Sequence, residues 1–377
     1  MRRNVLLPLL ALAVLSATDP VSAAGPGPLR FARMSVKQGL SQSTVLCIYQ
    51  DSRGFMWFCT EDGLNRYDGY GFVVYRHDPA DPASLPNNFV RDVVEDAEGN
   101  LWVATEGGGV ARWMAASDRF QSYRHRPDDP ESLAGDRVRT LRVDGSGQVW
   151  IATRGQGLDR LDPRTGKVTH YRGNAADARS LSDDTVTALL LDRKGTLWVG
   201  TNGGLNRYDG AGGFRCYRSD ASDPSSLADD QVRSLAEDTS GTLWVGTQSG
   251  GLHRLLADGK FQRLRKAEGD ARSLSNDFVR AIITDREGRL WVATPTGLNL
   301  LDHKRGGFVQ YHNDPADPES LSDDDLMSLY EDRGGVLWVG TRAGGVNRWN
   351  PRQWSFGHER ARADGLSHNY VTAFAVG

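Results

Sequence analysis

Several features are scarce in this chain, and each scarcity excludes a class of protein. Three cysteines among 377 residues are too few for a disulfide framework, and no Cys/His spacing suggests zinc, so we predict no metal and no other cofactor. The 45 basic and 48 acidic residues nearly balance, which leaves no broad basic face for nucleic acid. The sequence also has no nucleophile elbow and no phosphate-binding loop. We therefore predict no nucleic-acid partner and no enzymatic activity for this segment.

Long apolar runs are absent except at the N-terminus. Arg2 and Arg3 precede the apolar run 5–15, and small residues at 21–23 provide a cleavage site, which is the pattern of a secretory signal peptide. We expect residues 1–24 to be this signal and the exported protein to be periplasmic, with its parent anchored in the inner membrane. An uncleaved membrane anchor is the alternative, but the apolar run is too short to favour it.

Repetition is what the chain has in abundance. Tryptophan recurs every 45 to 48 residues, each time after an apolar residue and shortly before a threonine. This period suits one four-stranded sheet per repeat, and seven sheets arranged radially form a β-propeller. We therefore predict an all-β fold, a seven-bladed β-propeller of four-stranded antiparallel blades. The blade-core tryptophans are Trp57, Trp102, Trp150, Trp198, Trp244, Trp291 and Trp338.

An Asp-x-x-Gly turn precedes each tryptophan strand. Aspartate can accept a backbone hydrogen bond at the start of the turn, and glycine takes the positive φ that its end requires. A catalytic group is normally singular because one environment tunes its pKa, so an aspartate repeated seven times is better explained as a turn former. We predict no catalytic residue. The turn aspartates are Asp51, Asp96, Asp144, Asp192, Asp238, Asp285 and Asp332.

The joints between repeats indicate where the ring closes. Six joints end in Ser-Leu, whereas the joint before the first repeat reads Gly39-Leu40-Ser41 and the joint after the seventh reads Gly365-Leu366-Ser367. The eighth repeat therefore resembles the first. We predict one propeller over residues 25–354, in which a strand around residues 29–34 completes the seventh blade. Residues 355–377 would be the first strands of a second, truncated propeller, and we expect the natural protein to continue.

Two of the three cysteines fall on the first two strands of blade one. Cys47 and Cys59 lie across a hairpin, so a disulfide formed on export is geometrically possible. Cys59 also takes the place that Gly or Ala fills in every other blade, which suits a small core residue. The sequence leaves open whether the two cysteines are bridged, and Cys216 would be unpaired in either case.

A ligand would bind at one end of the ring, because loops from different blades converge there around the channel. Residues that vary between repeats are the better candidates, since repeated residues already have a structural role. In the loops between second and third strands the varying residues mix donors, acceptors and two guanidinium groups, which suits a hydroxyl-rich or acidic ligand such as an oligosaccharide or another small polar molecule. These candidate ligand-binding residues are Glu61, Asp62, Glu106, Arg154, Gln156, Asn202, Gln248 and Arg342.

The first repeat resembles a known family. The run Asp51-Ser52-Arg53-Gly54-Phe55-Met56-Trp57, followed by Asp62-Gly63-Leu64-Asn65-Arg66-Tyr67-Asp68-Gly69, is similar to the two-component regulator propeller repeat. That repeat forms the periplasmic sensor region of hybrid histidine kinases and of related diguanylate cyclases. The resemblance implies a sensor of a two-component phosphorelay. Its partners would be a second propeller and downstream domains of the same chain.

Other functions remain open beside the kinase sensor. The chain would also suit the sensor region of a diguanylate cyclase, a protein-protein interaction scaffold that forms a homodimer, or a secreted propeller enzyme. The sequence does not identify the ligand, nor does it say whether this ring or a later domain binds it.

Overall fold

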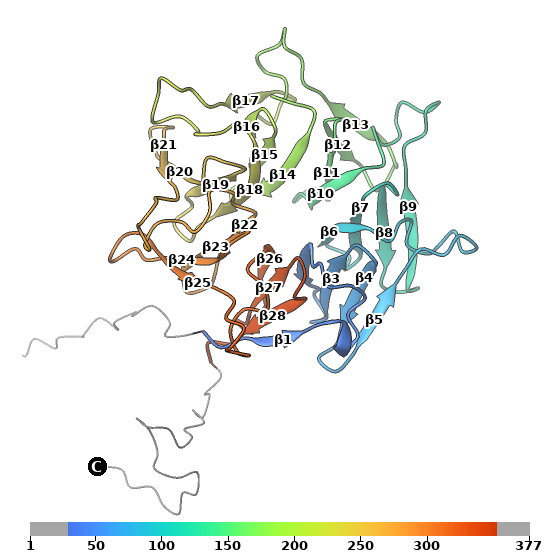
Figure 1. Ribbon diagram of the computed structural model, residues 1–377. Coiled ribbons are helices and arrows are strands. Elements are labelled where there is room, and N and C mark those ends of the chain that lie inside the picture. The colour runs from blue at the N-terminus through green and yellow to red at the C-terminus, as the bar shows by residue number, and fades with distance from the viewer. Residues whose placement is uncertain (1–28, 353–377) are drawn as a thin grey trace, which may run out of the picture.

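The computed structural model describes residues 29–352, which form seven sheets around a central channel (Figure 1). Every sheet has four strands, and all pairings within the sheets are antiparallel. This arrangement confirms the predicted seven-bladed propeller. Residues 1–24 and 355–377, the predicted signal and second propeller, lie outside the described residues. Over the range 29–352, no helix has the length and apolar character needed to cross a membrane.

In six blades the four strands follow chain order, beginning beside the channel. Blades one to three contain β2 (Cys47–Gln50), β3 (Met56–Thr60), β4 (Gly63–Tyr67), β5 (Phe72–Tyr75); β6 (Val90–Glu95), β7 (Leu101–Thr105), β8 (Val110–Met114), β9 (Arg119–Tyr123); and β10 (Val138–Val143), β11 (Val149–Thr153), β12 (Leu158–Leu161), β13 (Val168–Tyr171). Blades four to six contain β14 (Val186–Leu191), β15 (Leu197–Thr201), β16 (Gly204–Tyr208), β17 (Phe214–Tyr217); β18 (Val232–Glu237), β19 (Leu243–Thr247), β20 (Leu252–Leu255), β21 (Phe261–Leu264); and β22 (Ala281–Thr284), β23 (Leu290–Thr294), β24 (Gly297–Leu301), β25 (Phe308–Tyr311). Blade seven contains β26 (Leu326–Glu331), β27 (Leu337–Thr341), β28 (Val346–Trp349) and β1 (Ala32–Met34), which a short 3-10 turn, η1 (Val36–Gln38), follows.

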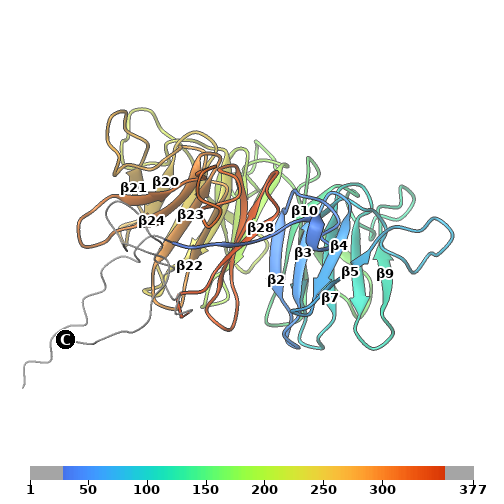
Figure 2. The ribbon, with the colours of Figure 1, turned by 60° about the horizontal axis from the view of Figure 1, so that its bottom comes forward.

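Strand β1 closes the ring, as the sequence predicts. It pairs antiparallel with β28, with Arg33 opposite Asn347, and Figure 2 shows it running along the outer edge of blade seven. The two ends of the described chain therefore share one sheet. This pairing covers the edge of β28, which would otherwise present unpaired backbone groups.

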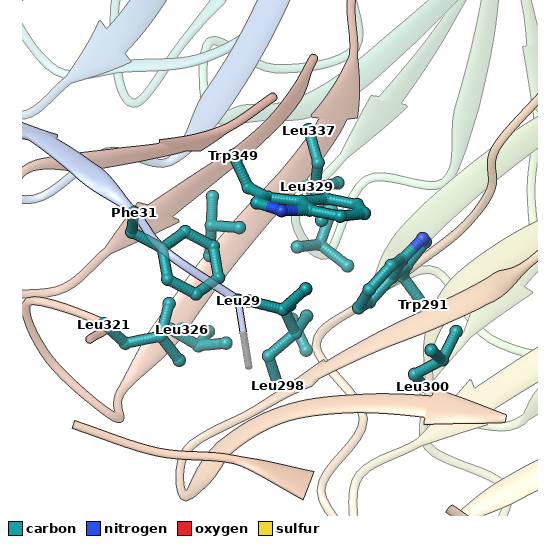
Figure 3. Close-up of a cluster of buried hydrophobic side chains, with 12 residues drawn as sticks. Leu29, Phe31, Trp291, Leu298, Leu300, Leu321, Leu326, Leu329, Leu337 and Trp349 are labelled. Atoms are coloured by element: carbon teal, nitrogen blue, oxygen red, sulfur yellow. The ribbon is translucent and has the colours of Figure 1, made fainter. Parts of the chain in front are cut away.

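Apolar packing reinforces the closure. Leu29 and Phe31, only 7% and 4% exposed, lie in a cluster with Trp349 of blade seven and Trp291 of blade six (Figure 3). Burying one large apolar side chain is worth roughly 1.5–3 kcal/mol, so these two residues are a substantial part of the seam. The N-terminal segment therefore joins blades six and seven as well as completing a sheet.

The tryptophan strands are the most deeply buried elements. In all seven blades the second strand is buried at every position. A strand that packs against neighbours on both faces shows no alternation of apolar and polar residues. The continuous apolar character of these strands thus follows from the sandwiching of each blade between two others.

The Asp-x-x-Gly turn and the tryptophan form one unit. In blade four, Asp192 Oδ1 accepts the backbone N–H groups of Lys194 and Thr196, and Oδ2 accepts Trp198 Nε1 at 3.0 Å. The indole bond recurs in all seven blades at 2.8–3.0 Å. Gly195 ends the turn with φ of +77°. One carboxylate therefore shapes the turn and satisfies the buried indole N–H.

On the opposite face, a side chain from the third strand holds the joint between blades. In blade four, Asn206 Oδ1 accepts the backbone N–H of Ser182 at 2.9 Å, and its Nδ2 donates to Ser182 Oγ at 2.8 Å. Asn65, Asn299 and Asn347 repeat both bonds in blades one, six and seven. We call this side chain the joint pin. It satisfies the backbone of a loop that has no sheet partner there.

Blades three and five use different joint pins. Alanine replaces the joint serine in both, and the pins are Asp159, which accepts Ala134 N, and His253, whose Nε2 accepts Ala228 N. Alanine has no hydroxyl oxygen for an asparagine amide to reach. A carboxylate or a neutral imidazole nitrogen therefore suits these joints because each can accept without needing that oxygen.

Two histidines at these joints, His170 beside Asp159 and the joint pin His253, have pKa values shifted in opposite directions. His170 Nδ1 lies 2.6 Å from Asp159 Oδ1 and its Nε2 lies 2.9 Å from Pro130 O, so both ring nitrogens face acceptors. The hydrogen bond to Asp159 raises the pKa of His170 and favours the imidazolium. Burial instead lowers the pKa of His253 to about 4, so this side chain is neutral at pH 7.

The structure also answers the question of the cysteines. Cys47 on β2 and Cys59 on β3 lie directly opposite each other and are joined by a disulfide. Cys216 is a free, partly buried thiol. The bridge therefore links the innermost strand of blade one to its tryptophan strand.

Candidate ligand-binding site

A backbone irregularity on the innermost strands directs side chains to the channel. In blade three, Val138 pairs with Thr153 and Thr140 with Ala152, so Arg139 between them is the extra residue of a β-bulge. Equivalent shifts place Arg91, Thr187, Arg233 and Met327 at the same position in other blades. A bulge re-aims the side chain that it carries.

Blades one and six place a residue equivalently just before their first strands. Leu46 N donates to Cys59 O and Arg280 N donates to Ala293 O. Cys47 and Ala281, the following residues, pair with these same partners. The bulge position therefore holds arginine in four of the seven blades and Leu46, Thr187 or Met327 in the others.

These residues line a cavity in the central channel. The cavity has a volume of about 610 Å³ and is lined by the innermost strands of all seven blades. Ligand sites in proteins typically have volumes of roughly 300–1,000 Å³. Its lining includes all seven bulge-position residues, namely Leu46, Arg91, Arg139, Thr187, Arg233, Arg280 and Met327.

Glu106 gathers three arginines at one side of the mouth. Its carboxylate contacts Arg91 Nε at 2.9 Å, Arg137 Nη2 at 2.7 Å and Arg154 Nη1 at 3.4 Å. Burial alone would raise the pKa of Glu106, but the hydrogen bond from Arg137 and the attraction of Arg91 outweigh it and bring the pKa below its usual range. One carboxylate thus faces three guanidinium groups, which leaves a local excess of positive charge.

A second carboxylate binds one arginine from blade six and one from blade seven. Asp325 accepts hydrogen bonds from Arg280 Nη1 and from Arg342 Nε, the latter at 2.6 Å. Arg280 also stacks on Phe278, with its guanidinium carbon 4.9 Å from the ring centroid. Two guanidinium groups share this carboxylate, so positive charge is again in excess.

Two arginines of the bulge position have no carboxylate in contact among the described residues. Arg233 donates to three neutral amide oxygens, those of Gln248, Asn202 and Gln231, at 2.6–2.8 Å. Arg139 makes one hydrogen bond, from Nε to Thr187 O at 3.0 Å. Both therefore keep an unpaired positive charge at the mouth.

Among the bulge-position arginines, Arg139 has the largest shift in pKa. Its side chain is exposed to the channel, and its four Nη N–H groups meet no acceptor among the described residues. Burial, together with repulsion from Arg91 and Arg233, lowers the pKa of Arg139 to about 10. Arg139 is still charged at neutral pH.

The structure divides the candidate residues named from the sequence into two groups. Five lie in the arginine network at the mouth, as contacts of the bulge-position arginines or of their carboxylates: Glu106, Arg154, Asn202, Gln248 and Arg342. Asp62 and Gln156 instead bind Arg76 and Arg172, which follow the outermost strands of their blades. Glu61 is exposed and has no partner among the described residues.

Sequence reasoning missed the arginines at the centre of this network. Each of them follows a valine at or just before the start of an innermost strand: Arg91, Arg139, Arg233 and Arg280. The sequence did contain a signal for them. One position varies between the seven repeats and holds arginine in four of them. Only the bulge reveals that this position faces the channel.

Paired Asn and Asp residues before the innermost strands cap the joints. Asp183 Oδ1 accepts Thr185 N at 2.6 Å, and Asp184 Oδ1 accepts Gly173 N at 2.7 Å. Their oxygens thus hold the backbone, which agrees with a capping role rather than a calcium site. Residues 29–352 contain no group of three or more side chains arranged to hold a metal ion.

Comparison with known sequences identifies the repeats. Six segments match the family model described as two component regulator propeller: residues 39–62, 84–107, 180–203, 226–249, 273–296 and 320–343. Each segment contains a joint, an innermost strand, an Asp-x-x-Gly turn and a tryptophan strand. Six of the seven blades therefore contain a segment that matches the two-component regulator propeller repeat.

Solved structures with this fold include extracellular domains of putative two-component and one-component systems. The extracellular domain of a putative hybrid two-component system from B. thetaiotaomicron matches with a TM-score of 0.74 and 27% identity, over 86% of this chain and 42% of that one. The extracellular domain of a putative one-component system from the same organism matches with a TM-score of 0.69 and 23% identity, over 85% of this chain and 39% of that one. At this level of identity the match indicates a shared fold.

A curated relative adds a local match. Histidine kinase P4 of Formosa agariphila is 51% identical over 47 residues, which are 12% of this chain and 3% of that protein. This chain thus spans less than half of these extracellular domains and matches a small part of the kinase.

Proposed function

We propose that this chain is the extracytoplasmic ligand-sensing region of a membrane sensor, a histidine kinase of a two-component phosphorelay, and that it is not itself an enzyme. The observation that carries the proposal is the match over 86% of the chain to the extracellular domain of a hybrid two-component system. The predicted signal sequence at residues 1–24 supports an extracytoplasmic location. The 47-residue match to a histidine kinase supports the choice of output.

The proposed ligand is an oligosaccharide that binds at the channel mouth. The mouth presents many hydrogen-bond groups, with guanidinium, amide and carboxylate side chains contributed by several blades. Such a mixture matches the alternating donors and acceptors of sugar hydroxyls. The cavity behind it has room for a few sugar rings.

Thermal unfolding of the full chain with a panel of neutral and acidic oligosaccharides tests this function. A ligand that binds only the folded state raises the unfolding midpoint, by an amount that grows with its concentration. We expect at least one oligosaccharide to do so. If no sugar shifts the midpoint, and sedimentation shows dimers forming with concentration, the ring is an interaction platform and the proposal is wrong.

A further inference from the structure

The charge at the channel mouth is far from balanced. Of seven guanidinium groups there, five share two carboxylates and two have no carboxylate in contact among the described residues. Glu106 pairs with Arg91, Arg137 and Arg154, Asp325 pairs with Arg280 and Arg342, and Arg139 and Arg233 pair with neither. The nearby carboxylates of Asp229 and Asp323 accept backbone N–H groups of Ser249 and Ala343. Deeper in the channel, Arg142 pairs with Asp92 at 2.9 Å. The excess is therefore concentrated at the mouth.

The excess of positive charge is greatest at the bulge positions of blades two to five. Arg139 and Arg233 have no carboxylate partner among the described residues, and Arg91 shares Glu106 with two other arginines. Thr187, between Arg139 and Arg233 in the order of blades, is the only neutral bulge-position residue on this arc. Folding has thus brought like charges together, which costs free energy unless an anion is bound.

The donors of these arginines are open to a ligand. Within residues 29–352, Arg139 has four Nη N–H groups without an acceptor, and its one hydrogen bond to Thr187 O holds the side chain in place. Arg233 is held by three amide oxygens. A guanidinium group presents paired N–H donors in the geometry that a carboxylate or sulfate accepts. Fixed, partly desolvated donors bind such groups more strongly than freely moving surface arginines do.

We propose that the channel mouth is an anion-binding site, in which Arg139 and Arg233 hold the oxyanion group of a ligand and Arg91 adds to the field. The ligand class is an acidic saccharide, which carries carboxylate or sulfate groups. The anion site rests on the arginine geometry alone. Its role as the site of the stimulus rests on the proposed sensing function.

Isothermal titration calorimetry on the full chain, at constant ionic strength, tests the site. The probes are tetragalacturonate, its neutral counterpart galactotetraose, and sodium sulfate. The variants are Arg139→Gln and, as a matched control, Arg164→Gln, which removes a guanidinium from an outer loop of the same blade, where the side chain is 81% exposed. Arg233→Gln provides a second test if the first variant does not fold.

We expect tetragalacturonate to bind the wild type and the Arg164→Gln control equally. Arg139→Gln should weaken that binding by about tenfold or more, because a charge-assisted contact with the ligand's oxyanion group is lost. Affinity should also fall as salt is raised. Equal binding of tetragalacturonate to the wild type and to both channel variants, or no binding at all, would overturn the anion site.

The neutral and inorganic probes separate this inference from the proposed function. If galactotetraose binds as tightly as tetragalacturonate and ignores Arg139→Gln, the anion site is overturned while oligosaccharide sensing stands. If sulfate binds as tightly as tetragalacturonate, with the same loss in Arg139→Gln, the anion site stands and the saccharide ligand is wrong.

Discussion

The two faces of the ring differ in how closely the seven blades agree. At the Asp-x-x-Gly face every blade makes the same bond from a tryptophan indole to a turn carboxylate. At the opposite face the joint pin is asparagine in only four blades, and the bulge position holds four different residue types.

This difference separates structural constraint from function. A buried indole N–H needs an acceptor in every blade, so its partner does not vary. A residue at the bulge position has no buried partner that recurs in every blade, so it is free to differ. This variation within one chain is a further reason to propose the ligand site at the mouth.

Removing a turn carboxylate should have the largest effect on stability. Asp51 is fully buried and accepts Arg53 N, Phe55 N and Trp57 Nε1. We expect Asp51→Ala to lower the free energy of unfolding by about 3–4 kcal/mol, because a buried indole and the turn lose their acceptor. Urea unfolding measures this. Glu61→Ala in the same blade is the control and should change stability by less than about 0.5 kcal/mol. Similar midpoints for both variants would show that the turn bonds are dispensable.

Lowering the pH should destabilise the fold through His253, the joint pin of blade five. The pKa of His253 is about 4 in the folded state and 6.5 in the reference state, so the unfolded chain takes up the proton first as pH falls. We expect a loss of up to about 3 kcal/mol between pH 6.5 and 4. Chemical unfolding at a series of pH values measures it.

The control for this prediction is the double variant Ala228→Ser with His253→Asn, which recreates the Ser182 and Asn206 pair of blade four. Between pH 6.5 and 4, the double variant should not show the loss of stability that comes from protonation of His253. His170, whose raised pKa stabilises the fold as pH falls, contributes equally to both proteins. An unchanged pH dependence in the double variant would mean that His253 does not titrate in this way.

Removing a mouth arginine should have the smallest effect on stability. Arg139 faces like charges, so Arg139→Gln should leave the unfolding midpoint unchanged or raise stability by up to about 1 kcal/mol. Arg142→Gln on the same strand is the control and should cost about 1 kcal/mol, because Arg142 hydrogen-bonds Asp92. Thermal unfolding compares them. A clear loss of stability in Arg139→Gln would make this arginine structural and remove the contrast between the faces.

The sequence predicted the repeated parts of the molecule well. Tryptophan spacing led to seven blades, and the altered joints around Gly39 and Gly365 led to closure by an N-terminal strand, which the pairing of β1 with β28 confirms. These features rest on local hydrogen bonds and apolar runs that recur, so each repeat supports the interpretation of the others. The sequence also placed the candidate ligand site at this face, which stays a prediction, and five of the eight candidate residues lie in the arginine network.

Only the tertiary structure decided the remaining features. Whether Cys47 meets Cys59 depends on the register of a hairpin, and whether Arg139 faces the channel depends on a one-residue bulge. Both are set by how strands pair in space, and a shift of one residue in pairing changes which way a side chain points. The sequence by itself determined the number of blades and their cores, because burial and turn chemistry act locally. The charge gathered at the channel mouth arises only when seven distant strands meet around one axis.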